Sequence, residues 1–413
     1  MPGDSVAVLG AGGVGVCAAL MLRRRGRDVF LIDRAPPASE TSGGNAGIVS
    51  DSSAVPLNNP SLRANLFSLL CGGESLRLHR RYAAANLPWL WRFWKHSAAD
   101  SSARRARSLY ALLSRSKTLH RRWMAECGLR NYPREGGWMK CYRRERSFAA
   151  AAAERRLWDS LGVRYEIADA ARIAELAPSS RPLFARGVYL PETFSAPDPR
   201  RAVREYAKQF SERGGRFMRE DIRALRPLRD GWETTFRGGG KLKTKAAVVA
   251  LGPWSRDFLR RMNIRAPIAF ERGGHRNFAP GDAELNVAVA DVDGGYIAVM
   301  QETSVRMTSG VYFAGLDAPP PKAQLDAAER RLREAVHGLG AQIGGDWFGA
   351  RPTAPDAMPI VGECKIPGLW LATAHQHIGF ATAPATGELV ADLMCGDAPR
   401  ISAAAFSPAR FGL

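Results

Sequence analysis

Three glycines and one acid near the start of the chain have the types and spacing of a dinucleotide site. Gly10, Gly12 and Gly15 follow the apolar run Val6–Leu9 in a G-x-G-x-x-G pattern, and Asp33 ends a second apolar run. The first glycine permits a tight turn, the second lets a pyrophosphate approach the backbone, and the third lets a helix lie close to the strand. The helix N-terminus then attracts phosphates, and the carboxylate can accept hydrogen bonds from a ribose.

Two further stretches could reach the same ligand. Residues 41–50, TSGGNAGIVS, form a polar and glycine-rich segment that either wraps the other side of the pyrophosphate or is a mobile loop. Near the C-terminus the strand GLWLATA precedes a helix, which we expect to begin near Thr382 with Pro384 in its first turn and to stop at Gly396. This second helix dipole could point at the same ligand.

The elements that position these residues alternate between helices and strands. The first helix is expected to run through Leu22 and to stop near Gly26. Hydrophobic periodicity then predicts a basic helical region at 62–129, a strand at 136–143, a helix at 148–161, strand and loop at 187–199, a helix at 200–213, strands around 232–236 and at 246–251, an antiparallel sheet with a hairpin over 264–316, and a helix at 322–339.

Composition indicates a globular protein of two parts. The chain has 413 residues, is 46% hydrophobic and carries a formal net charge of +19. Its six cysteines form no C-x-x-C pair, which favours reduced thiols in a cytoplasmic location. No apolar run reaches about 18 residues, so a transmembrane helix is not expected. The first strand begins by Ser5, which we expect to leave no room for a cleaved signal peptide.

At this point the chain resembles the D-amino-acid oxidase/dehydrogenase superfamily of FAD enzymes, nearest its bacterial D-amino-acid dehydrogenase branch. The resemblance spans nearly the whole length and rests on six motifs in a familiar order: GAGGVG, LID, TSGGNAG, VALGPWS, GARPTAPDAMPIVG and TAHQHIGFATAPATG. It implies an α/β fold with a Rossmann-like FAD-binding domain assembled from residues 1–60, 199–262 and 346–413. Residues 61–198 and 263–345 would form a substrate domain with an antiparallel β-sheet, helices and the basic segment.

The resemblance also implies roles for particular residues. Arg351 matches the arginine that binds the substrate carboxylate, and a guanidinium fork suits that task. The alternative is a structural arginine in a surface ion pair. Gln376 and His377 lie in the loop that would pass the flavin and the substrate amine, and the backbone of Ile222 would hold the adenine. The residues assigned to the cofactor are Gly10, Gly12, Gly13, Val14, Gly15, Asp33, Arg34, Thr41, Ser42, Asn45, Ala46, Gly47, Ile222, Gly252, Trp254, His375, His377, Ile378, Gly379 and Phe380.

Two departures from the family pattern bear on the pocket. Ala374 and Gln376 stand where glycines are usual, which predicts a different pocket shape near the flavin. No cysteine follows Arg351 where sarcosine-oxidase relatives attach their flavin, so we expect FAD to be bound non-covalently. His375 and His377 form an H-x-H pair, but no further ligand accompanies them in the loop, so no metal is predicted.

Three histidine and tyrosine residues of the expected sheet have two readings. His275, Tyr296 and Tyr312 could line the substrate pocket or be ordinary sheet residues, and the sequence leaves both open.

The implied reaction oxidises the Cα–N bond of an amino acid to an imine, which hydrolyses to a 2-oxo acid and ammonia. The leading hypothesis is a dehydrogenase of D-amino acids, D-proline or D-hydroxyproline among them, that passes electrons to a quinone, a respiratory chain or a dye. An FAD oxidase of glycine, sarcosine or a related secondary amine is the alternative. The positive charge also raises a nucleic-acid-binding protein, but no recognisable nucleic-acid module appears, so no nucleic-acid partner is expected.

The basic charge concentrates in one window. Residues 77–156 contain 20 Lys or Arg against 5 Asp or Glu, together with the sequence PWLWRFWK at 88–95. Such a window could contact the inner face of the cytoplasmic membrane, because anionic lipids attract cations and Trp favours the headgroup layer. Alternatively, the aromatic residues pack into the core while the arginines form a solvated face.

Overall fold

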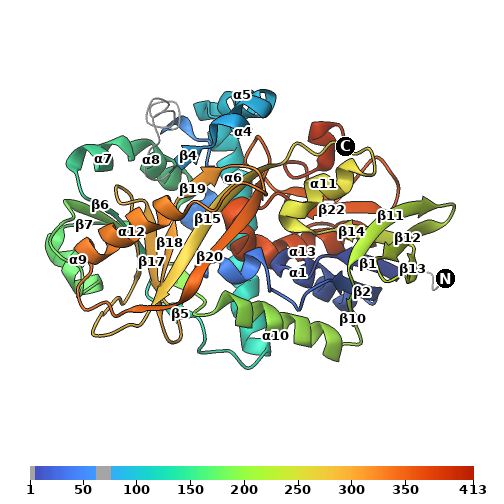
Figure 1. Ribbon diagram of the computed structural model, residues 1–413, viewed down its shortest axis with the longest axis horizontal. Coiled ribbons are helices and arrows are strands. Elements are labelled where there is room, and N and C mark those ends of the chain that lie inside the picture. The colour runs from blue at the N-terminus through green and yellow to red at the C-terminus, as the bar shows by residue number, and fades with distance from the viewer. Residues whose placement is uncertain (1–4, 62–75) are drawn as a thin grey trace.

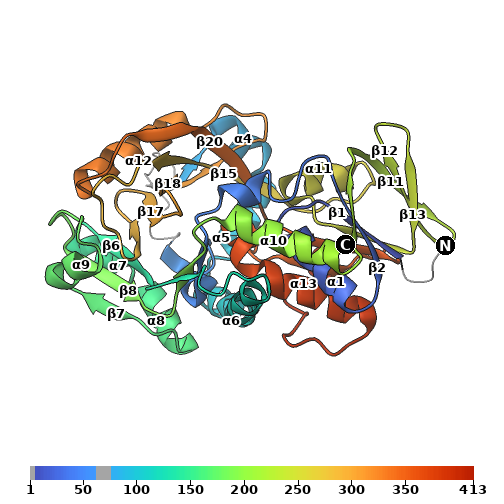
Figure 2. The same cartoon turned by 90° about the horizontal axis from the view of Figure 1, so that it is seen from below.

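The structure is a computed structural model that describes residues 5–61 and 76–413. Figures 1 and 2 show a parallel sheet with its helices towards the end that carries the N-terminus, and a larger sheet at the opposite end. The long helix α6 (Ala99–Glu126) runs between them. The mixed α/β fold with two sheet-based parts, expected from the sequence, is confirmed. The first part of the predicted basic helical region, 62–75, lies outside the described residues.

The first sheet has six strands in the order β10-β2-β1-β14-β22-β21. Its strands are β1 (Ser5–Leu9), β2 (Asp28–Asp33), β10 (Arg216–Arg219), β14 (Ala246–Val249), β22 (Leu369–Thr373) and β21 (Ile360–Glu363). All neighbours are parallel except β21 and β22. β1 is buried along its whole length, as expected for a parallel strand covered on both faces. The carboxyl ends of β1 and β2 therefore lie side by side, and they carry Gly10 and Asp33.

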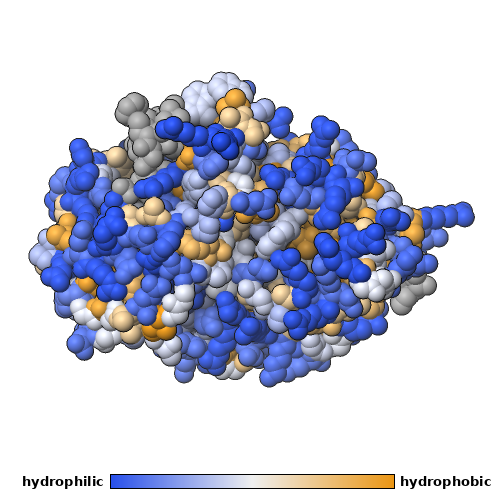
Figure 3. All heavy atoms as spheres, viewed as in Figure 1, coloured by the Kyte–Doolittle hydropathy of each residue, from blue (hydrophilic) through white to orange (hydrophobic). Residues whose placement is uncertain are grey.

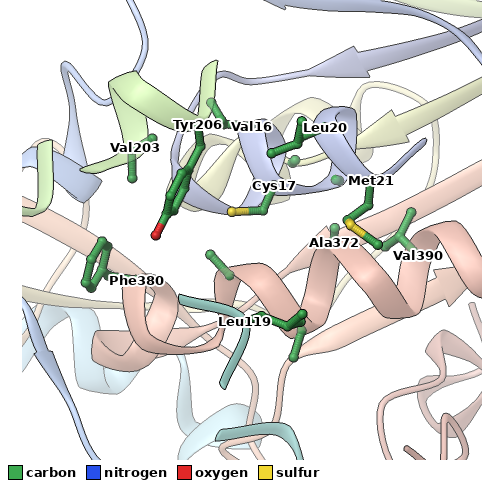
Figure 4. Close-up of a cluster of buried hydrophobic side chains, with 14 of the residues drawn as sticks. Val16, Cys17, Leu20, Met21, Leu119, Val203, Tyr206, Ala372, Phe380 and Val390 are labelled. Atoms are coloured by element: carbon green, nitrogen blue, oxygen red, sulfur yellow. The ribbon is translucent and has the colours of Figure 1, made fainter. Parts of the chain in front are cut away.

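Helices α1 (Gly13–Arg24), α10 (Pro199–Glu212) and α13 (Gly379–Cys395) pack on this sheet. α1 ends two residues before Gly26, which has a left-handed φ of 81°, so the helix stops near Gly26 as predicted. Figure 4 shows side chains from the helices meeting in one cluster, among them Cys17, Tyr206 and Phe380. A Cβ on Gly387 would lie 2.5 Å from the backbone of Cys17, so this glycine lets α13 approach α1 closely.

The second sheet has ten strands, mostly antiparallel, and β15 and β20 form its longest pair. Its strands are β4 (Leu76–Leu78), β19 (Val311–Phe313), β15 (Ala269–Phe278), β20 (Gln342–Thr353), β18 (Val305–Ser309), β17 (Tyr296–Met300), β16 (Ala288–Asp291), β6 (Trp138–Tyr142), β8 (Arg186–Leu190) and β7 (Glu166–Ala168). The predicted hairpin is β17 and β18. Helix α12 (Lys322–Ala335) contributes Leu325 and Leu332 to the core of this sheet.

Smaller elements complete the described part of the chain. One three-stranded sheet contains β11 (Ile222–Leu228), β12 (Gly231–Phe236) and β13 (Lys241–Thr244). A second contains β3 (Ile48–Val49), β9 (Phe194–Ser195) and β5 (Arg134–Glu135). The remaining helices are α4 (Arg80–Ala85), α5 (Leu87–Lys95), α7 (Glu145–Ala150), α8 (Ala152–Leu161), α9 (Ala170–Leu176) and α11 (Ser255–Arg260), with 3-10 turns η1 (Thr41–Gly44), η2 (Asp51–Ala54), η3 (Gly252–Trp254), η4 (Gln376–Ile378) and η5 (Pro408–Phe411).

Two predicted helices have different bounds in the structure. The helix expected at 148–161 is two helices, because Ala151 leaves helical geometry and the Phe148 carbonyl bonds to the side chain of Arg155. The helix expected at 322–339 ends at Ala335, because Val336 turns extended and forms a bridge with Ser180.

Helix α13 starts earlier than the sequence predicts. The helix begins at Gly379 rather than near Thr382, so Pro384 lies inside it instead of in its first turn. A proline has no N–H, which leaves the carbonyl of Phe380, four residues earlier, without its helical donor. His120 of α6 replaces that donor, since its Nε2 lies 2.9 Å from the Phe380 oxygen and its Nδ1 lies 3.0 Å from the Tyr206 hydroxyl. Burial lowers the pKa of His120 to about 4, so the ring is neutral and donates through Nε2.

Candidate functional site

One cavity of about 480 Å³ extends from the glycine turn after β1 to the paired strands β15 and β20. Of the residues that the sequence assigns to the cofactor or to catalysis, all but Gly15 and Gly47 line it. The cavity thus brings together segments more than 300 residues apart in the chain, including Gly10 and Arg351.

The glycine turn is shaped so that side chains are excluded. A Cβ on Gly10 would lie 2.5 Å from the Ala250 oxygen, and Gly10 has a φ of 106°. A Cβ on Gly15 would lie 1.9 Å from the Gly10 oxygen, so Gly15 acts in packing the helix on the turn rather than in lining the cavity. The amide of Gly13 donates to Ser42 Oγ at 2.9 Å, which ties the helix N-terminus to the loop after β2.

Asp33 has a structural task in addition to the predicted one. Its Oδ2 accepts from the amide of Ala11 at 2.7 Å, and its Oδ1 accepts from the amide of Ala35 at 3.0 Å. The carboxylate therefore stabilises the glycine turn while it lines the cavity. Each oxygen keeps a second lone pair, which a ribose hydroxyl can use.

The loop 41–47 is held by the second sheet rather than hanging free. Arg306 of β18 donates to the backbone oxygens of Gly43 and Asn45, at 3.3 and 2.7 Å. The side chain of Asn45 donates to the His377 oxygen at 3.3 Å. Gly44 has no room for a side chain, because a Cβ would lie 2.1 Å from the ring of Trp347. The reading as a mobile loop is therefore not supported by its contacts.

The substrate end of the cavity is built on β15 and β20. Glu271 pairs with Arg351, Gly273 with Gly349, and His275 with Trp347. Directly opposed residues of an antiparallel pair project to the same face, so these six share one surface of the sheet. The rings of His275 and Trp347 stack with their centroids 4.9 Å apart.

Arg351 lies over the gap that a glycine leaves in this surface. A Cβ on Gly273 would lie 3.0 Å from both terminal nitrogens of Arg351, so the guanidinium rests against that backbone. In the described part of the chain, no ion pair to Arg351 is formed. Burial lowers the pKa of Arg351, and the nearby Glu271 carboxylate opposes this shift. A desolvated cation that lines a cavity without a bound acid can receive an anionic ligand.

Next to Arg351 lies a buried carboxyl group that the sequence analysis did not single out. Glu271 has no exposed surface, and its Oε1 accepts from the hydroxyl of Thr353. Its Oε2 has no hydrogen-bond donor among the described residues, and Nδ1 of His377 lies 3.6 Å from it. The His377 side chain is 41% exposed and lines the cavity.

The loop 374–378 is strained at the two positions where the resembling family has glycine. Ala374 and Gln376 have φ values of 62° and 52°, a region that side chains rarely adopt. The backbone thus keeps a glycine-like conformation, and the substitution of Ala and Gln for the two glycines adds a methyl group and an amide to the pocket. The Nε2 atom of Gln376 is buried without a partner among the described residues. His375 bonds Thr386 at 3.0 Å, and burial lowers its pKa to about 3.

The cavity excludes three predicted candidates and includes several residues that were not predicted. His275, Tyr296 and Tyr312 are not among the residues that line the cavity; Tyr296 lies in the core of the second sheet, and Tyr312 packs against His79. The lining residues that sequence reasoning missed at the substrate end include Ile48, Trp138, Ile297, Thr308 and Trp347. Strand register within the ten-stranded sheet brings four of them together, whereas Ile48 comes from β3 of a separate sheet. No three His, Cys, Asp or Glu side chains within 5–61 and 76–413 gather as a metal site.

The cavity fits an FAD molecule. One end of the cavity has a glycine turn and a helix N-terminus, which suit a pyrophosphate, and a carboxylate, which suits a ribose. A half-buried arginine lies at the far end. Gly10 permits the tight turn against Ala250, and Gly12, where a Cβ would meet only Ser42 Oγ at 3.3 Å, leaves the backbone open to a pyrophosphate.

Comparison with known proteins agrees with this geometry. The family model described as DAO, FAD dependent oxidoreductase, matches residues 5–393. A D-amino-acid oxidase of Bradyrhizobium diazoefficiens is 28% identical over 421 residues, with 99% of each chain covered. The crystal structure of glycine oxidase from Geobacillus kaustophilus superimposes with a TM-score of 0.76 at 20% identity, covering 98% of each chain. L-proline dehydrogenase from P. horikoshii does so with a TM-score of 0.76 at 17% identity, covering 100% of this chain and 98% of the other.

Proposed function

The chain belongs to the DAO family of FAD-dependent oxidoreductases, and from this premise we propose that it oxidises a small D-amino or D-imino acid, such as D-proline or D-hydroxyproline. It is an FAD enzyme that acts on the CH–NH2 or CH–NH group of amino acids. The observation that carries the substrate proposal is Arg351, which lies over Gly273 in the cavity that also contains the glycine turn.

Arg351 would bind the substrate carboxylate. The guanidinium presents two parallel N–H donors, a carboxylate presents two acceptors, and the pair is stronger where water is excluded. The surroundings favour this role over a surface ion pair, because the side chain lines the cavity and has no acid bound to it among the described residues.

The surface beyond Arg351 favours a small and largely apolar side chain. Ile48, Trp138, Ile297 and Trp347 present apolar atoms to the cavity, and Thr308 adds a single hydroxyl. A charged side chain would have to be desolvated there without a partner, which is costly. A pyrrolidine ring needs no such partner, and the hydroxyl of Thr308 can bond to a ring hydroxyl.

The remaining site residues would position the reactants. FAD, when bound, supplies the acceptor for the hydride that leaves the substrate Cα. Gly10, Gly12 and Asp33 would hold its adenosine diphosphate half, while Asn45 and the loop 375–380 would lie along the flavin. Gln376 offers a buried Nε2 donor to a ligand oxygen. Orientation of the Cα–H bond by Arg351 then contributes most to the rate.

A substrate panel tests the proposal. The purified yellow holoenzyme is mixed anaerobically with D- and L-proline, D-hydroxyproline, D-alanine, glycine and sarcosine, and bleaching of the flavin absorbance is followed. We expect the D-imino acids to bleach it fastest and a dye to accept the electrons faster than oxygen does. Bleaching by glycine or sarcosine alone, with rapid oxygen consumption, would favour the oxidase alternative. Bleaching by L-proline alone would overturn the assignment to the D-series.

We also propose that α5 contacts an anionic membrane surface, where a quinone acceptor would be reached. The aromatic residues of this helix divide: Trp89 and Phe93 are buried and pack with Phe313, whereas Leu87 and Trp91 are 62% and 58% exposed. Core packing thus explains one face of the helix and leaves the other apolar and solvated. At the top of Figure 3, apolar and hydrophilic spheres mix over α5.

Exposed cations lie on this helix and on its neighbours in the chain. Arg92 and Lys95 are exposed on α5, Arg80 and Arg81 on α4, and Arg104 and Arg107 on α6. Arg105 is not part of this surface, since it is buried and donates to Asn58 and to backbone oxygens. No helix in the described ranges is long and apolar enough to cross a bilayer, so the proposed contact is peripheral.

Vesicle co-sedimentation tests the contact. Vesicles with anionic lipid should bind the holoenzyme at low salt, neutral vesicles should not, and salt should release it. The double variant Leu87→Ser, Trp91→Ser should bind several-fold more weakly. Ile167→Ser, Ile343→Ser removes two apolar residues exposed elsewhere and should bind like the wild type. Equal binding of both variants, or no binding by the wild type, would reject α5 as the contact.

A further inference from the structure

We propose that Glu271 and His377 form a dyad that takes the proton from the substrate ammonium group before hydride transfer. This inference rests on the proposed oxidation of an amino acid. It assigns Glu271 as a positioning residue that acts through the ring of His377.

The first observation is the unusual state of Glu271. Its side chain is completely buried, one oxygen is bonded by Thr353, and the other lacks a hydrogen-bond donor among the described residues. Leaving a buried carboxyl oxygen without a donor is costly and is rarely retained without a function. Arg351 shares the same surface of the sheet and is within reach of the Glu271 charge, but no ion pair joins the two in the described chain, so Oε2 is left for another donor.

The second observation is the direction from which His377 approaches. Its Nδ1 lies 3.6 Å from Oε2 of the fully buried Glu271. The side chain is 41% exposed and lines the cavity beside Arg351. A carboxylate that accepts from Nδ1–H fixes the tautomer in which Nε2 carries a lone pair, and that nitrogen is then the one available to a ligand. The ring needs a small movement to close this contact, which ligand binding can supply.

The charged groups around His377 come from three segments. Glu271 faces it from β15 and Arg351 lies nearby on β20, directly opposite Glu271. On its own loop, His375 is bonded to Thr386 and is neutral because burial lowers its pKa to about 3. Glu271 is not among the residues that line the cavity, so a substrate with its carboxylate on Arg351 would meet His377 rather than Glu271 as the acceptor of its ammonium proton.

The proton and electron balance is complete. The ammonium N–H bond breaks and a new N–H bond forms at His377 Nε2, giving a neutral amine and an imidazolium stabilised by Glu271. The Cα–H bond then breaks with its electron pair, which passes as hydride to the flavin, and a C=N bond forms. Because the side chain is partly exposed, the imidazolium returns its proton to solvent.

The test uses the variant Glu271→Gln, which keeps the shape of the side chain and removes its charge. Its rate of anaerobic flavin reduction at neutral pH should fall about 10- to 1,000-fold. The affinity for a cyclic carboxylic acid without an amine, measured by calorimetry, should not change. The rate should recover as pH is raised to where the substrate amine is itself neutral, because no base is then required.

His377→Gln supplies a second variant that removes an exposed group and is expected to fold. It should show the same loss and the same recovery at high pH, and the double variant should be no slower than His377→Gln alone. His337→Gln, at an exposed histidine outside the cavity, is the matched control and should behave like the wild type.

Three outcomes would overturn the dyad: wild-type rates in both variants, a loss of the same factor at every pH, or weaker binding of the amine-free acid. These differ from failure of the proposed function, in which the wild-type holoenzyme itself is not reduced by any amino acid.

Discussion

Replacing His120 by Phe should destabilise the protein strongly, although the residue lies outside the cavity. The substitution keeps a buried ring but removes both contacts of the imidazole, which leaves the Phe380 carbonyl without its donor and the Tyr206 hydroxyl with only the backbone oxygen of residue 120, at 3.5 Å. An unpaired buried group costs about 1–3 kcal/mol and a lost hydrogen bond about 0.5–1.5 kcal/mol, so the expected loss is about 1.5–4.5 kcal/mol. That is a large part of the 5–15 kcal/mol that typically stabilises a domain.

The second half of the prediction concerns Pro384. Adding Pro384→Ala to His120→Phe restores a backbone N–H that can reach the Phe380 carbonyl, so the double variant should regain about 1–3 kcal/mol. Pro384→Ala alone should have little effect, because His120 already occupies that oxygen. The four proteins are compared by urea unfolding at fixed FAD concentration, since bound cofactor shifts apparent stability. If the two substitutions proved additive, His120 would not be the substitute for the proline's missing donor.

Three further predictions concern the titration of His120, the strained backbone at Ala374 and the attachment of FAD. Burial lowers the pKa of His120 to about 4, below its unfolded value of about 6.5, so its contribution is complete above pH 6.5 and is lost towards pH 4. The wild type should therefore lose roughly 3 kcal/mol more than His120→Phe over that range in urea titrations. Ala374→Gly should raise stability by about 1 kcal/mol by relieving the left-handed backbone, while Ala381→Gly inside α13 should lower it by about as much. Acid denaturation should release all flavin into the supernatant as FAD, and flavin that stays with the precipitate would contradict non-covalent binding.

Most of the residues predicted for the dinucleotide half line one cavity in the structure, and they could be named from the sequence because their signal is local. Gly10, Gly12 and Asp33 lie within 24 consecutive residues, and each is needed for a backbone approach or an end-of-strand position that its own segment creates. The strand–helix–strand order then follows from apolar periodicity alone.

The substrate half was harder because its residues meet only through strand register. Glu271 and Arg351 are opposed across β15 and β20, although 80 positions separate them, and nothing in the local sequence of Glu271 indicates a cavity. The start of α13 was missed for a similar reason. A proline inside a helix is unfavourable unless another group donates to the carbonyl that the proline leaves unpaired. Here that group is His120, which is 260 residues away from Phe380 in the sequence. Long-range partners overrode local propensity in both cases.

The most direct test of the central claim compares two substrates in one variant. Arg351→Met should keep its flavin spectrum and lose about 2–5 kcal/mol of transition-state stabilisation for D-proline, measured as kcat/KM from anaerobic flavin reduction. Arg351→Lys should recover only part of this, because an ammonium lacks the planar fork. Pyrrolidine, which has the same ring and amine but no carboxylate, should be oxidised slowly and equally by wild type and Arg351→Met. If Arg351→Met oxidised D-proline like the wild type, or lost activity towards pyrrolidine by the same factor, Arg351 would not be the group that binds the substrate carboxylate.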